Sequence, residues 1–116
     1  MPPPLPPATL QRVLQAAEKV THKTIAEFES KDRHQPLVNA RFAIALVCAE
    51  LARKQPNTLD EQLSDCLHRC RNAVAYSRMA AKKFIKVDRE FQWLVSEIRK
   101  SVRRMSEPTE QQEKED

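Results

Sequence analysis

Residues 28–51 read FESKDRHQPLVNARFAIALVCAEL, a basic turn that runs directly into an apolar stretch. Pro36 suits the first turn of a helix, where its missing N–H costs little, and Pro56 ends the stretch. Two apolar stripes at helical spacing lie between these prolines. The first stripe is Leu37, Ala40, Ile44, Cys48 and Leu51, and the second is Val38, Phe42, Ala45 and Ala49. The sequence therefore predicts a helix over 37–54 at the centre of the hydrophobic core.

Further helices are predicted on both sides of this central one. The chain contains no glycine, and its apolar residues recur at helical spacing with little of the alternation that marks strands. The helix starts that we expect from capping and turn residues are Thr9, Thr21, Asn57 or Thr58, Asn72 and Asp88. We predict an all-α fold: a compact bundle of about six helices, in which the fourth and the fifth form a helix-turn-helix.

The two ends of the chain differ in composition from the middle. Residues 1–8 form a proline-rich leader that is expected to be disordered, and residues 1–7, with five prolines, are not expected to be helical. Residues 106–116 are polar and acidic and are also expected to be disordered. The helical domain should therefore cover residues 9–105.

Positive charge is concentrated in one part of the chain. The net charge is +4, but residues 106–116 hold five acids against one lysine. Residues 69–104 carry eleven Lys or Arg against three acids, whereas residues 1–68 are balanced. Such asymmetry is typical of a face that binds a polyanion. A solvated helical surface is the alternative explanation of the same charge pattern.

The predicted fifth helix, 72–87, carries much of this charge. At about 100° per residue, one side gathers the basic residues Arg71, Arg78, Lys82 and Lys86. The opposite side, which we expect to be buried, is Ala73, Tyr76, Ala80 and Phe84. Such a cationic rod suits the DNA major groove, with Lys83 as a further phosphate contact. The side chains best able to read base edges are Asn72, Ser77 and Arg78.

The stretch that begins at Phe28 resembles the C-terminal duplex-binding domain of bacterial replication initiators of the DnaA type. That family shows Leu-x-Ser-Lys-x-Arg-x-x-Pro-x-Val-x-Ala-Arg before an apolar helix that ends in Glu-Leu. The matching residues are Phe28, Ser30, Lys31, Arg33, Pro36, Val38, Ala40, Arg41, Glu50 and Leu51. The resemblance implies a Trp-repressor-like helix-turn-helix protein of bacterial or phage type that binds duplex DNA. It also implies that Lys31 and Arg33 reach the minor groove.

The resemblance is looser around the predicted turn between the fourth and fifth helices. The family signature there has glycines for the bend and Asp-His-Thr-Thr for bases and phosphates. This chain has Leu63-Ser-Asp-Cys-Leu67 and then Arg71-Asn72, without the His and the two Thr. The family's target sequence is therefore not implied. The family's ATPase module has no counterpart in this sequence.

Enzymatic and metal functions find little support. Cys66 and Cys70 share a helical face, but His68 points about 160° away from both, so we expect no metal site. No nucleophile has a suitable base and no glycine loop cradles phosphate, so we expect no enzyme and no cofactor. Trp93 is expected to be partly buried.

Duplex DNA is the partner that these observations favour, with a replication-linked or regulatory role. An alternative is an adaptor that keeps the fold and binds an acidic protein through the same cationic face. The chain has three cysteines, no run of 18 apolar residues and no signal pattern at its start. We therefore expect a cytoplasmic, nucleoid-associated protein without a membrane partner, either a monomer or a homodimer.

Overall fold

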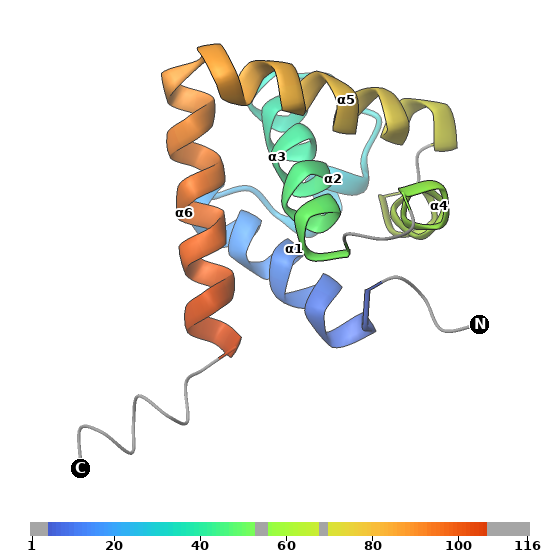
Figure 1. The fold of residues 1–116 in the computed structure, drawn as a ribbon, viewed down its shortest axis with the longest axis horizontal. Helices are drawn as coiled ribbons and strands as arrows, with labels where there is room; N and C mark the ends of the chain where they lie inside the picture. Colours follow the sequence, from blue (N-terminus) through green and yellow to red (C-terminus); the bar gives the residue numbers. More distant parts are fainter. Residues whose placement is uncertain (1–4, 53–55, 68–69, 107–116) are drawn as a thin grey trace.

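The computed structural model describes residues 5–52, 56–67 and 70–106, with the backbone alone for 56–58, 71 and 106. These residues form six helices and no strand (Figure 1). The helices are α1 (Pro7–Thr21), α2 (Ile25–Glu29), α3 (Gln35–Ala52), α4 (Pro56–Leu67), α5 (Arg71–Val87) and α6 (Arg89–Ser106). The predicted all-α bundle of about six helices is therefore confirmed.

The central position predicted for the third helix is also confirmed. α3 is surrounded by the other five helices and contacts each of them. Every residue from Ala40 to Cys48 is buried. Leu51, predicted to continue one stripe, is 46 % exposed, so the buried part of α3 ends one turn earlier. α3 is long and apolar enough to cross a membrane, but more than half of it is buried inside the bundle, as in the core helix of a folded domain.

The first two helices do not begin at the predicted capping residues Thr9 and Thr21. α1 begins at Pro7, because proline is well suited to the first helical position. Thr21 is the last residue of α1, and α2 is instead capped by Thr24. The Thr24 hydroxyl accepts a hydrogen bond from the Glu27 backbone N–H, and the Glu27 carboxylate accepts one from the Thr24 N–H. This reciprocal capping box fixes the start of a helix of only five residues.

The predicted leader is shorter than residues 1–8, because its fifth residue belongs to the core. Leu5 is only 2 % exposed. The Gln62 side chain of α4 accepts a hydrogen bond from the Leu5 N–H and donates one to the Leu5 carbonyl. Residues 1–4 of the leader and residues 107–116 of the acidic tail lie outside the described residues. Asn57 and Thr58, the predicted caps of the fourth helix, lie inside α4, because α4 begins at Pro56.

α5 and α6 meet at a sharp corner (Figure 1), and Asp88 forms it as predicted. The Asp88 carboxylate accepts a hydrogen bond from the Phe91 N–H at 3.0 Å, so it caps α6. Three ring contacts join α5 to its neighbouring helices. Phe42 of α3 meets both Tyr76 and Phe84 of α5, and Phe84 meets Phe91 of α6. The aromatic contacts tie the two C-terminal helices to the central one.

The three thiols should react in the order of their exposure. Cys48 is buried, Cys66 is half-buried and Cys70 is exposed. Burial raises the pKa of Cys48 and of Cys66, which leaves less of the reactive thiolate at a given pH. We expect a disulfide reagent at pH 8 to label Cys70 first, Cys66 only at higher pH, and Cys48 only after unfolding. Mass spectrometry of peptides checks the order, and early labelling of Cys48 would contradict the described core.

Candidate nucleic-acid interface

α5 is rotated by about a quarter turn from the orientation that its sequence predicts. Val74 and Ala81 point into the core. Tyr76 and Phe84, predicted to be buried, are 67 % and 40 % exposed. That prediction is wrong because both rings lie against Phe42 at the side of the helix and not beneath it. The predicted basic side and the predicted apolar side are therefore both flanks of α5.

A buried ion pair explains the rotation and corrects the prediction for Arg78. The Arg78 guanidinium donates from Nε and Nη2 to the two carboxylate oxygens of Asp60 on α4, at 3.1 and 3.0 Å. The side chains are 14 % and 4 % exposed. The hydrogen bonds to Asp60 raise the pKa of Arg78. Arg78 therefore joins α5 to α4 and does not belong to the exposed ridge that we predicted.

Removing Asp60 should cost the fold more than a typical surface mutation. Asp60→Ala leaves the Arg78 guanidinium without its bidentate acceptor at a mostly desolvated site, so we expect a loss of about 2–4 kcal/mol. Urea unfolding followed by circular dichroism measures this loss. Asp65→Ala, at an exposed position one turn further along α4, is the matched control and should change stability by less than about 0.5 kcal/mol. Equal free energies of unfolding for Asp60→Ala and Asp65→Ala would show that the Asp60–Arg78 pair does not stabilise the fold.

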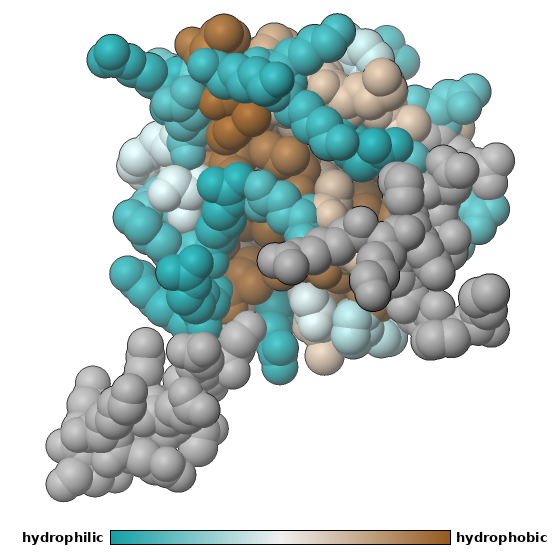
Figure 2. Space-filling view, viewed as in Figure 1, coloured by the Kyte–Doolittle hydropathy of each residue, from teal (hydrophilic) through white to brown (hydrophobic). Residues whose placement is uncertain are grey.

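The outward face of α5 combines polar, apolar and cationic residues. Asn72, Met79 and Lys83 lie near its midline and Tyr76 lies between this midline and the flank that meets Phe42, and all four are exposed. Lys82 and Lys86 are exposed on one flank, and residues 71–87 contain no acid. Figure 2 shows hydrophilic side chains extending along the edge of the molecule where α5 lies. The three lysines predicted for DNA binding therefore reach solvent together.

Two other residues of α5 that were predicted to contact DNA, Ser77 and Arg71, are not among these exposed side chains. Ser77 is half-buried, and its hydroxyl donates to the Ala73 carbonyl at 3.0 Å, so its proton is already used within the helix. The side chain of Arg71 lies outside the described residues. Asn72 is thus the exposed polar residue nearest the start of α5 whose amide is described.

The basic turn is held by the side chain of Arg41, which is only 5 % exposed. Its Nε donates to the Phe28 carbonyl at 2.9 Å, and its Nη1 donates to the Asp32 carbonyl at 2.6 Å. Its Nη2 donates to the carbonyls of Glu27 and Ser30 at 3.1 and 2.9 Å. One planar guanidinium therefore satisfies four carbonyls that come from the end of α2 and from the turn.

Short-range hydrogen bonds complete the shape of the turn. The Ser30 hydroxyl donates to the Glu27 carbonyl, and the Asp32 carboxylate accepts from the His34 N–H at 2.9 Å. Asp32 is thus occupied in part by the backbone of the turn. Lys31 and Arg33, the residues predicted to contact DNA here, are both exposed. The turn is thus held by hydrogen bonds, and two cations extend from it into solvent.

The turn and α5 lie next to each other. A groove of about 300 Å³ separates them and is lined by Arg33 on one side and by Ala73, Tyr76 and Ser77 on the other. Phe42 of α3 also lines it. Residues that are 40 or more positions apart in the sequence therefore line one groove, with the exposed cation Arg33 on its turn side, while Lys82 and Lys86 lie on the other flank of α5.

Arg41 and Asp60 build this interface but carry little signal of that role in the sequence. An arginine between Ala40 and Phe42, within an apolar stretch, is the one hint, because a buried arginine needs many acceptors. Within the described part of the chain, no three His, Cys, Asp or Glu side chains gather as metal ligands. No protein-family model, no curated protein and no solved structure matches the chain.

Proposed function

We propose that this protein is a non-enzymatic binder of double-stranded DNA with a replication-linked or regulatory role. In this proposal α5 enters the major groove, and the turn that Arg41 holds contacts the adjacent backbone or minor groove. The observation that carries the proposal is the alignment of Lys82, Lys83 and Lys86 on the outward side of a helix that has no acid. Lysines so placed suit the phosphates on both sides of a groove.

The packing around α5 supports this placement. α4 packs against α5 on its inner side, as the first helix of a helix-turn-helix does. The outer side of α5 is exposed over nearly its whole length, and an α-helix fits the width of the major groove. Asn72 is the side chain best placed to read a base edge, since its amide can pair with adenine. The resemblance of residues 28–51 to DnaA-type domains points to the same partner.

A salt titration tests the proposal. A fluorescein-labelled duplex of about 20 random base pairs is titrated with the protein at several salt concentrations. Five phosphate contacts predict a slope of log affinity against log salt concentration of about −4.5. The five cations are Lys31, Arg33, Lys82, Lys83 and Lys86. Absence of binding at low salt, or an affinity that does not change with salt, would refute the proposal.

A second candidate function is binding of an acidic protein through the same face. The exposed Tyr76 and Met79 favour it, because an aromatic and a methionine at the centre of a surface are typical of protein interfaces. The labelled duplex separates the two functions when it is compared with a capped peptide of alternating glutamate and leucine at equal salt. Tight binding of the peptide without binding of the duplex would favour the adaptor.

A further inference from the structure

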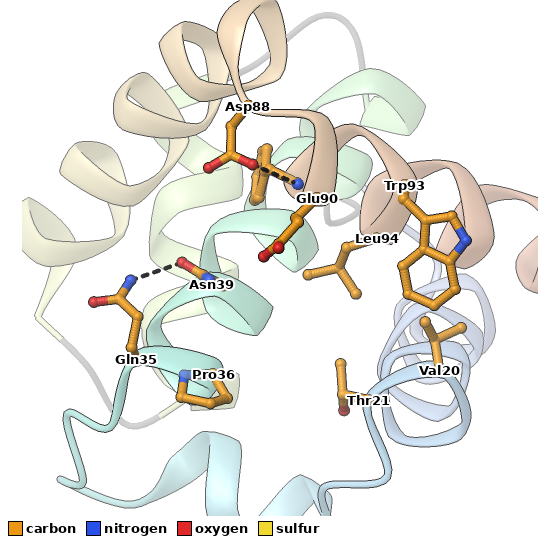
Figure 3. Close-up of a pocket in the computed structure, with 10 residues that line it drawn as sticks. Val20, Thr21, Gln35, Pro36, Asn39, Asp88, Glu90, Trp93 and Leu94 are labelled. Carbon is orange, nitrogen blue, oxygen red and sulfur yellow. Dashed lines mark hydrogen bonds between the residues drawn. The ribbon is translucent and has the colours of Figure 1, made fainter.

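A second groove lies between the end of α1, the start of α3 and the start of α6 (Figure 3). Its volume is about 570 Å³, nearly twice that of the groove beside the basic turn. Apolar side chains from all three helices line it: Val20, Pro36, Phe91 and Leu94. The groove therefore offers an apolar floor that no other described part of the chain covers.

The polar groups of this groove are mainly acceptors. Asp88 and Glu90 both line it, and in Figure 3 the carboxylate of Glu90 points into the space between α3 and α1. Asp88 accepts the Phe91 N–H through one of its oxygens. Arg89 lies about 100° around α6 from Glu90. The groove thus has an acidic edge on a chain whose net charge is +4.

The two amides on the opposite wall are already paired. The Gln35 side chain donates to the Asn39 side chain at 2.8 Å, as the dashed line in Figure 3 shows. Both amides are uncharged, so they leave the negative charge of the carboxylates across the groove uncancelled. Asp88 and Glu90 therefore still attract a positively charged group to this edge of the groove.

Trp93 forms one rim of the groove, beside Val20 (Figure 3). Predicted to be partly buried, it is 60 % exposed. In Figure 3 the indole lies across Leu94 from the Glu90 carboxylate, and the face of an exposed indole attracts positive charge. Arginine suits this groove best, since its guanidinium can stack on an aromatic ring or pair with a carboxylate.

We propose that this groove docks a basic segment of a partner protein. One arginine or lysine of the segment pairs with Asp88 and Glu90 and another lies against the Trp93 indole, while the apolar side chains between them pack on the floor. The proposal goes beyond duplex binding and does not depend on it. Nucleic acid and acidic proteins are excluded as occupants by the two carboxylates, which repel them.

Fluorescence tests this directly, because Trp93 is the only tryptophan of the chain. The probe is a capped hexapeptide of alternating arginine and leucine, titrated into the full-length protein. We expect a saturable change in Trp93 emission with a Kd at or below about 1 mM. An arginine–serine hexapeptide lacks the apolar side chains that pack on the floor, and a glutamate–leucine hexapeptide lacks the positive charge. Each should bind at least about tenfold more weakly.

Matched variants locate the binding. Glu90→Gln should weaken the arginine–leucine peptide about tenfold, whereas Asp65→Asn, an equal charge change on the exposed side of α4, should leave it unchanged. Thermal unfolding confirms that both variants fold, since both positions are exposed. Three results would overturn the proposal: no saturable change in emission, equal binding of the arginine–serine peptide, and equal binding by Glu90→Gln. Trp93 emission that changes with protein concentration alone would also overturn it, because a second copy would then cover the groove.

Discussion

Replacement of Lys82, Lys83 and Lys86 by alanine is expected to weaken duplex binding about 100-fold at about 0.1 M salt. All three lysines are exposed on α5, so their removal should leave the fold intact. Each phosphate contact releases a condensed counterion, and three lost contacts lower the magnitude of the salt slope by about 2.7. Fluorescence anisotropy with the random-sequence duplex, repeated over a range of salt, measures both quantities.

A matched triple variant controls for net charge. Lys100, Arg103 and Arg104 are exposed near the end of α6, on the side of the molecule away from α5 (Figure 1). Alanine at these three positions removes the same charge and should weaken binding less than about tenfold, through the long-range field alone. If the two triple variants bind alike, the protein attracts DNA by charge only and α5 has no special part in the binding.

Arg41→Ala is expected to destabilise the fold by about 3–5 kcal/mol, because the Phe28, Ser30 and Asp32 carbonyls lose their hydrogen bonds from Arg41 at a partly buried site. The Glu27 carbonyl keeps its hydrogen bonds from Ser30. Since folded domains are stable by about 5–15 kcal/mol, this is a large share of the total. We expect the melting temperature to fall by about 15 °C and duplex affinity to fall with it, as the turn no longer directs Lys31 and Arg33.

The lysine variant separates charge from geometry at this position. Arg41→Lys keeps the positive charge, but a single ammonium cannot reach carbonyls that surround a planar fork. We expect it to recover less than half of the lost stability, measured by the same thermal unfolding. Full recovery in Arg41→Lys, or an unchanged melting temperature in Arg41→Ala, would show that the four hydrogen bonds contribute little.

The helices could be predicted from sequence because their signals are local. The apolar stripes of residues 37–48, the absence of glycine and the Asp88 cap each depend on near neighbours in the chain. The predicted starts of the first two helices were wrong, because Thr9, Thr21 and Thr24 have the same capping chemistry and only packing selects between them. Leu5, just before α1, is held by Gln62, a contact across 57 residues that no local pattern reveals.

The orientation of α5 could not be predicted, because it depends on one long-range pair. Its sequence offers two opposite faces, and each could be the buried one. Neither is buried, because Asp60 draws Arg78 inward so that Val74 and Ala81 point into the core and Tyr76 and Met79 toward solvent. The cations Lys31, Arg33, Lys82, Lys83 and Lys86 are nevertheless exposed, because charged ends of long side chains reach water from either flank of a helix.

The most direct test of a shared duplex-binding surface is amide chemical-shift mapping of the full-length protein with the random-sequence duplex. The account predicts that shifts concentrate in two stretches, residues 30–34 and residues 72–86, and that both saturate at the same duplex concentration. The end of α6 should change little. Shifts confined to α6, or spread evenly over all exposed cations, would contradict a surface formed by the basic turn and α5.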